Sequence, residues 1–118
     1  MTSDVLDAGT LQMLRALNQE GEPDVLAEVL ELFLEDAPAR VAAIEAAAAA
    51  GDTRGLERAA HGLKGSAGNI GALGLQAICK TLEACGREGD AGPVPALIAD
   101  MGAEFGRVRA AALEVLAG

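Results

Sequence analysis

The chain has 118 residues and a formal net charge of −9, and 51% of its residues are hydrophobic although only 2% are aromatic. This length suits one domain, and the shortage of β-branched and aromatic runs favours helices around an aliphatic core. The negative charge disfavours nucleic acid, which is bound through Lys and Arg, and also anionic membrane surfaces. The start of the chain does not resemble a signal peptide, and no apolar run is long enough to span a bilayer, so we expect a cytoplasmic protein.

The first two predicted helices are separated by a polar break at residues 19–22. The first runs over residues 8–18, with Asp7 as its N-cap and with leucines at 11, 14 and 17 on one side. The second begins at Pro23, because proline is favoured at the first helical position. Its apolar spacing continues past Pro38, so a bend rather than a break is expected there, and Gly51 ends the helix.

Three further helices are predicted over residues 54–69, 73–87 and 94–116. Asp52 or Thr53 caps the first of these, Gly71 marks the bend that follows it, and a loop rich in Gly and Pro precedes the last one. Each long helix carries one apolar stripe, and the connections are short. The sequence therefore predicts an all-α fold, an antiparallel four-helix bundle with the short first helix covering one end, and residues 1–118 as a single domain.

Both cysteines, Cys79 and Cys85, fall on the predicted helix 73–87. Six residues apart, they are separated by roughly 240° around the axis and ~9 Å along it, which excludes a mutual disulfide. We expect both thiols to be buried and reduced. With one histidine in the chain, they match no zinc-binding pattern, so no metal site is predicted.

The only histidine, His61, lies in the stretch AAHGLKGSAGNIGA at residues 59–72. On a helical wheel, Leu56, Leu63 and Ile70 lie close together and define the core face, with alanines 59, 60 and 67 beside them. His61 falls roughly 150° from the centre of this face. Its ring is therefore predicted to face water.

Three glycines, at positions 62, 65 and 68, surround this histidine in a chain that uses alanine freely elsewhere. Each costs about 1 kcal/mol relative to alanine inside a helix. Gly65 and Gly68 share the face of His61, so they leave a bare strip beside the imidazole through which another molecule can approach. The alternative is a helix that is merely rich in small residues.

Lys64 lies one turn after His61, on the flank of the same face. A free imidazole has a pKa near ~6.5, so at pH 7 one ring nitrogen is an available nucleophile. Such a nitrogen can attack a phosphoryl group, and an ammonium nearby offsets the charge of the phosphoryl oxygens. The chain has no nucleotide-binding loop. The phosphate must therefore come from another protein.

The segment from His61 to Ala72 resembles the signature of histidine-containing phosphotransfer (HPt) domains, H-x-L-K-G-S-x-x-x-x-G, and LFLEDAPARVAAIEAAAAAGD resembles the long second helix of that family. The resemblance implies that His61 is the phosphorylated residue, Lys64 its electrostatic partner and Gly65 the access position. Gly68 is a further small residue of the strip. Ser66 is expected to be structural, capping or bonding backbone.

A polar residue on the next helix often supports the imidazole in this family. Glu83 is the candidate, although the polar stripe that it shares with Gln76, Lys80 and Arg87 reads as a solvated face.

What the resemblance implies is a phosphorelay intermediate that is not an enzyme. Its partners would be receiver domains of hybrid histidine kinases and response regulators, met through a shallow, largely apolar surface around His61. Magnesium belongs to the receiver in such transfers, so no cofactor is expected in this chain. A monomer is also expected.

Three alternatives stay open at this point. A helical adaptor of the same shape would leave His61 unmodified. A histidine kinase fragment is disfavoured because Gly62 stands where the dimerisation helix of sensor kinases usually has an acidic residue. A piece cut from a larger kinase would look the same as this chain, although Met1 and the full set of predicted helices favour a stand-alone protein.

Overall fold

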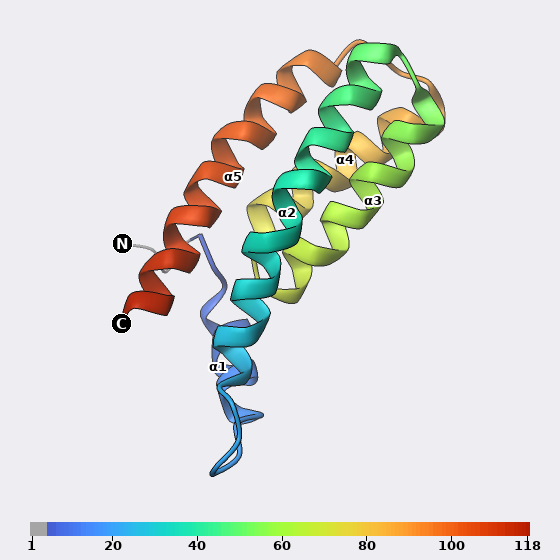
Figure 1. Cartoon of the computed structure of the whole chain (residues 1–118). Helices are drawn as coiled ribbons and strands as arrows, with labels where there is room; N and C mark the ends of the chain where they lie inside the picture. Colours follow the sequence, from blue (N-terminus) through green and yellow to red (C-terminus); the bar gives the residue numbers. More distant parts are fainter. Residues whose placement is uncertain (1–4) are drawn as a thin grey trace.

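The computed structural model describes residues 5–118, and this part of the chain contains five helices and no strand. They are α1 (Ala8–Ala16), α2 (Val25–Ala50), α3 (Thr53–Asn69), α4 (Leu73–Glu88) and α5 (Val94–Ala117). Helices α2 to α5 form an elongated antiparallel bundle, and α1 lies at the end of the bundle where α2 begins (Figure 1). The predicted fold class is confirmed.

Aspartate side chains cap the first three helices. Asp7 accepts a hydrogen bond from the Thr10 backbone at 2.9 Å, and Asp52 accepts one from Gly55 at 2.9 Å. Asp24 does the same for α2, so this helix begins at Val25 and the prediction of a start at Pro23 is wrong. An aspartate supplies an acceptor for an unpaired N–H at the helix start, which proline cannot do.

Helix α1 ends at Ala16, two residues earlier than predicted. Leu11 and Leu14 are buried. Leu17, predicted to share their side of the helix, lies beyond its end and is 57% exposed, so that prediction is wrong for Leu17. Helix α2 is continuous through Pro38 and ends at Ala50. Gly51 caps it as predicted, with a φ of 67°, a left-handed conformation suited to glycine. The bend at Pro38 stays a prediction.

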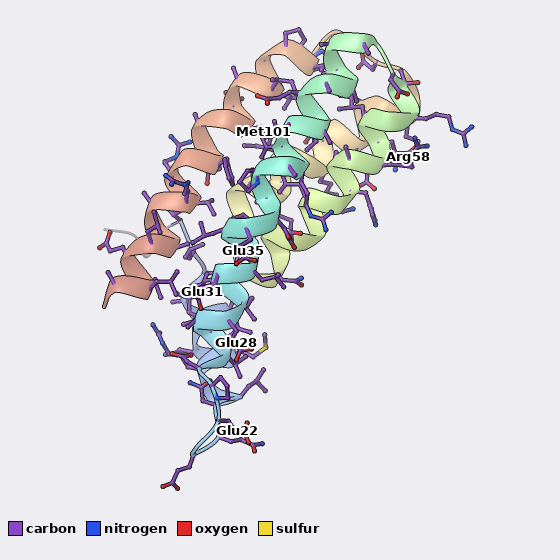
Figure 2. All side chains as sticks on the ribbon, in the orientation of Figure 1. Glu22, Glu28, Glu31, Glu35, Arg58 and Met101 are labelled. Atoms are coloured by element: carbon purple, nitrogen blue, oxygen red, sulfur yellow. The ribbon has the colours of Figure 1, made fainter. Side chains whose placement is uncertain are left out.

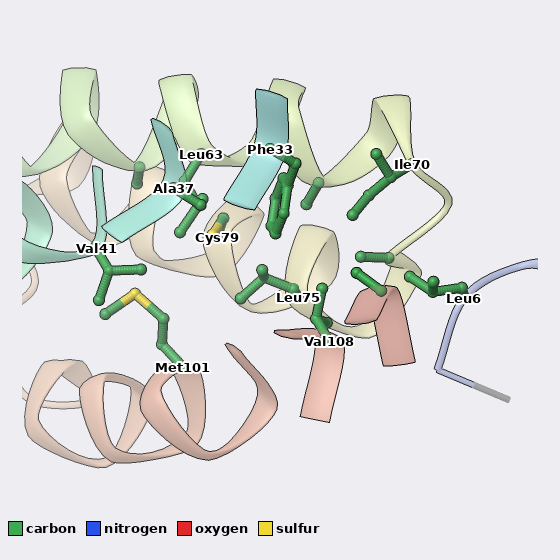
Figure 3. Close-up of a cluster of buried hydrophobic side chains, with 14 of the residues drawn as sticks. Leu6, Phe33, Ala37, Val41, Leu63, Ile70, Leu75, Cys79, Met101 and Val108 are labelled. Carbon is green, nitrogen blue, oxygen red and sulfur yellow. The ribbon is translucent and has the colours of Figure 1, made fainter. Parts of the chain in front are cut away.

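The core is aliphatic, with side chains from all four long helices meeting along the bundle axis (Figure 3). Phe33 of α2 provides the one buried ring, and its centroid lies 6.2 Å from that of the half-buried Phe105. Cys79 and Cys85 are both buried and unpaired, as predicted. Burial is the main cause that raises the pKa of Cys79 to about 12, with the nearby charge of Glu83 adding to it. Burial also raises the pKa of Cys85. Both thiols therefore stay protonated at neutral pH.

The backbones of helices α3 and α4 lie close together at Gly86. A Cβ placed on Gly86 would lie 2.6 Å from the backbone nitrogen of Glu57 and 2.7 Å from the carbonyl oxygen of Thr53. Backbone atoms cannot move aside as the end of a side chain can, so only glycine fits here. Residue 86 falls inside the predicted helix 73–87, but nothing in the sequence pattern indicated this packing role.

At the opposite end of the pair, the α3–α4 turn is tied to the segment that precedes α1. The backbone N–H of Asp7 donates to the carbonyl of Gly71 at 2.8 Å, and Leu6 is fully buried beside this turn. Gly71 has a φ of 73°, which the turn requires. Among the described residues, no helix has both the length and the apolar character needed to cross a bilayer.

Candidate functional site

His61 lies in the middle of α3, on the side turned away from the core. Leu56, Leu63 and Ile70 are buried as the wheel predicted, and the His61 side chain is 68% exposed. The prediction that the ring faces water is confirmed. The buried leucines fix the rotation of α3 in the bundle, and this rotation places the imidazole on the surface.

Glu83 of α4 joins His61 to Lys64. One carboxylate oxygen, Oε2, lies 2.7 Å from Nδ1 of His61, and the other, Oε1, accepts a hydrogen bond from Nζ of Lys64 at 2.5 Å. The residue is only 9% exposed. The expectation that its polar stripe is simply solvated is therefore wrong at Glu83, whereas Lys80 and Arg87 of the same stripe are exposed.

The electrostatics of this triad keep Glu83 ionised. The hydrogen bond from Lys64 is the largest influence and lowers the Glu83 pKa, burial opposes it, and the hydrogen bond with His61 lowers the pKa further. The net shift is downward. An ionised carboxylate can only accept hydrogen bonds, so Nδ1 of His61 carries the proton that it donates to Glu83.

In the neutral ring, this arrangement leaves Nε2 of His61 without a proton, on the side of the ring away from Glu83. Nε2 then has a free lone pair, which is what a nucleophile needs. Lys64 is half-buried, with 28% of its side chain exposed, and its ammonium lies within the same carboxylate-centred group. Nε2 of His61 can therefore attack an electrophile that approaches from solvent, and the ammonium of Lys64 lies nearby as a cation.

The three glycines around His61 have different surroundings. A Cβ on Gly65 would meet no atom within 4 Å, so the surface beside the imidazole is bare at that point. A Cβ on Gly62 would lie 2.6 Å from Nη1 of Arg40, and one on Gly68 would lie 2.5 Å from Nε2 of Gln76. The predicted open strip is therefore open at Gly65, and it is covered by long side chains from α2 and α4 at the other two positions.

Ser66 is half-buried in the groove between α2 and α3, which Asp36 and Arg40 also line. No hydrogen bond of its hydroxyl is found within residues 5–118, so the backbone bond expected of it is not formed. Sequence reasoning also missed Arg40, because nothing in the chain order connects it with the histidine motif. Within the described part of the chain, no cluster of His, Cys, Asp and Glu could hold a metal ion.

Residues 28–114 match the family model of the Hpt domain. The chain belongs to the Hpt domain family. This stretch runs from the first turns of α2 almost to the end of α5 and contains His61, Lys64 and Glu83. The family resemblance seen in the histidine motif is thus shown over most of the chain.

Known Hpt proteins resemble this chain in sequence and in structure. Histidine-containing phosphotransfer protein 2 of Arabidopsis thaliana is 36% identical over 78 residues, which cover 61% of this chain and 48% of that protein. Protein 5 of the same plant is 31% identical over 75 residues, with the same coverage. The chain therefore spans about half the length of these curated relatives. The crystal structure of histidine-containing phosphotransfer protein B from Pseudomonas aeruginosa matches with a TM-score of 0.87 and 34% identity, over 95% of this chain and 94% of that one.

Proposed function

We propose that this Hpt domain is a phosphorelay intermediate in which His61 accepts a phosphoryl group from the aspartate of one receiver domain and passes it to the aspartate of another. The observation that carries the proposal is the exposed imidazole whose Nδ1 is held by Glu83 at 2.7 Å. This contact leaves Nε2 as the reactive atom, and the open surface at Gly65 gives it access.

The phosphoryl transfer needs no additional group to accept or supply a proton. The lone pair of His61 Nε2 attacks the phosphorus of the receiver's aspartyl phosphate, and the bond between phosphorus and the aspartate oxygen breaks. The aspartate leaves as a carboxylate, and the imidazole, which keeps its Nδ1 proton, becomes a cation. The ionised Glu83 stabilises that cation through the existing hydrogen bond. The reverse sequence of bonds delivers the phosphoryl group to the next receiver.

Each neighbour of His61 has a separate role in this proposal. Lys64 offsets charge on the phosphoryl oxygens as they approach, although it shares its own charge with Glu83. Glu83 fixes the tautomer and the orientation of the ring. Gly65 keeps the approach free of side-chain atoms. Ser66 and Gly68 line the edges of the surface and take no part in the chemistry.

The other features of the proposed relay come from the partners. Receiver domains of hybrid kinases and response regulators supply the acceptor aspartates and the magnesium ion, so the chain acts as a phosphocarrier without kinase activity of its own. In this proposal it is a cytoplasmic monomer, and it associates with each partner briefly and leaves again. The proposal treats residues 1–118 as a single Hpt domain.

The test is incubation with a receiver domain phosphorylated on aspartate. Label should move to this protein and be acid-labile and base-stable, as expected of phosphohistidine, and it should be absent from His61→Gln. Profiling transfer against every receiver domain of the source organism would then identify the partners. Failure of transfer from all of them, with the protein folded, would favour the adaptor alternative.

A further inference from the structure

Arg40 of α2 reaches across the groove to α3 and lies over Gly62, the residue next to His61. Its Nη1 is 2.6 Å, and its Cζ 3.8 Å, from the place where a Cβ of Gly62 would stand. With a Cα–Cβ bond of ~1.5 Å and ~3.8 Å between consecutive Cα atoms, Nη1 lies no more than about 8 Å from the Cα of His61. An arginine from another helix thus lies against the residue that follows the reactive histidine.

This guanidinium has no ionic partner within the described residues. The four ion pairs found in residues 5–118 are His61–Glu83, Lys64–Glu83, Arg87–Glu57 and Arg107–Glu104. Lys64, the other cation at the site, is engaged by the Glu83 carboxylate at 2.5 Å. Arg40 therefore brings to the site a positive charge that forms no ion pair with a described residue, although Asp36 lines the same groove one turn earlier on α2.

The glycine at position 62 gives the arginine room to lie there. Any other residue would place a Cβ on the guanidinium and push it away from α3. Glycine costs about 1 kcal/mol relative to alanine inside a helix, so its presence here needs a reason. The approach of Arg40 explains why glycine stands at position 62. Access for another molecule, which explains Gly65, does not explain Gly62, because Arg40 covers the surface there.

We propose that Arg40 contacts the phosphoryl group that His61 carries, with its guanidinium donating hydrogen bonds to the phosphoryl oxygens. The inference rests on the proposed function and adds a residue to the same site. A phosphoryl group on Nε2 brings negative charge to the surface on the side of the ring opposite Glu83. A guanidinium has several N–H donors in one plane and binds phosphate oxygens two at a time. Arg40 approaches from α2, whereas Lys64 and Glu83 approach from the α4 side.

The experiment uses phosphoramidate, a small phosphate donor that needs no receiver domain. Nε2 of His61 attacks its phosphorus, the P–N bond of the donor breaks, and ammonia leaves. The phosphoryl group on His61 is then titrated with pH by phosphorus NMR. A neighbouring guanidinium favours the dianion, so in Arg40→Ala the acid dissociation constant of the phosphoryl group should fall by about threefold.

Three further variants separate a specific contact from general charge. Arg58 is an exposed arginine one turn before His61 that projects into solvent (Figure 2), so Arg58→Ala should change the dissociation constant much less. Arg40→Lys keeps the charge without the planar donors and should give an intermediate value. Gly62→Ala should act in the same direction as Arg40→Ala, because its Cβ displaces the guanidinium.

The outcomes distinguish this inference from the function on which it rests. An unchanged dissociation constant in Arg40→Ala, or an equal fall in Arg58→Ala, overturns the role of Arg40 while leaving the relay intact. A full response to phosphoramidate with no exchange with any receiver overturns the relay and supports the Arg40 contact. A wild-type His61 that phosphoramidate leaves unmodified overturns both.

Discussion

The contact between helices α3 and α4 differs at two positions along the bundle, a packed level around Gly86 and an open, reactive level around His61 and Gly65. Both levels depend on glycine. At Gly86 the helices touch backbone to backbone, with no space for even a methyl group. Two turns along α3, at His61 and Gly65, they are joined through the Glu83 carboxylate, and the surface beside the imidazole is empty. One level is close-packed and the other is polar and open.

The difference shows that the neighbours of a glycine decide its role. Gly86 is buried against Thr53 and Glu57, so it sets the separation of the two helices. That separation holds Glu83, three residues earlier on α4, within hydrogen-bond distance of His61 and Lys64. Gly65 faces solvent and affects only which molecules can approach the imidazole of His61. The packed level therefore positions the reactive level.

The largest expected effect on phosphotransfer comes from replacing the nucleophilic histidine, which leaves the packed level unchanged. His61→Gln should abolish phosphoryl acceptance, because an amide has no nucleophilic ring nitrogen. The free energy of unfolding, measured by urea denaturation, should stay within about 0.5 kcal/mol of wild type, since the side chain is exposed. A large loss of stability would show that the histidine also supports the fold and that the two levels are not separate.

Next in size is the effect of a methyl group at the packed level. Gly86→Ala should lower the free energy of unfolding by about 1–3 kcal/mol, because the helices must move apart. Gly65→Ala is the matched control, and it should raise stability by up to about 1 kcal/mol through better helix propensity. Equal responses of the two variants in urea denaturation would remove the distinction between these glycines.

A bulky side chain at the open level should affect transfer and not folding. Gly65→Leu should slow phosphotransfer from a receiver by about tenfold, which corresponds to ~1.4 kcal/mol in the barrier. Gly102→Leu is the control, since Gly102 of α5 is also exposed and a Cβ there meets nothing within 4 Å. Normal transfer rates in Gly65→Leu would end the explanation of Gly65 as an access position.

The smallest expected effect is a pH dependence that comes from Glu83. Its pKa is lowered in the folded state, chiefly by Lys64, so the ionised side chain stabilises the fold above the unfolded pKa of about 4.3. This contribution, less than about 1 kcal/mol for such a partly exposed ion pair, is lost as the pH falls through the folded value. Urea denaturation between pH 6 and pH 3 should show a weaker pH dependence in Glu83→Gln. An identical profile would mean that the bridge adds nothing to stability.

The sequence predicts the bundle well because its signals are local and repeated. Apolar spacing over many turns located each long helix, and the rotation of α3 followed from the spacing of Leu56, Leu63 and Ile70. The ends were less predictable, as Leu17 and the start of α2 show, because one capping aspartate outweighs a proline. A helix end depends on a few hydrogen bonds rather than on a repeated pattern.

The parts of the site that sequence reasoning missed are contacts between helices. The separation of 22 residues between His61 and Glu83, or of 22 between Arg40 and Gly62, has no local signature. Glu83 was named through the family resemblance, yet its burial was not foreseen, because a charged residue in a polar stripe suggests solvent. The tight fit at Gly86 was hidden for the same reason: its partners, Thr53 and Glu57, lie on another helix.

The chain has one histidine, and it also lacks tryptophan and tyrosine. Its imidazole signals in a nitrogen NMR spectrum therefore belong to His61 without any assignment experiment. Equally, any tryptophan fluorescence from a mixture with another protein comes from that protein alone. Both the chemical state of the ring and the arrival of a partner can thus be followed without attaching a chemical probe, because isotopic enrichment for the NMR spectrum leaves the molecule chemically unchanged.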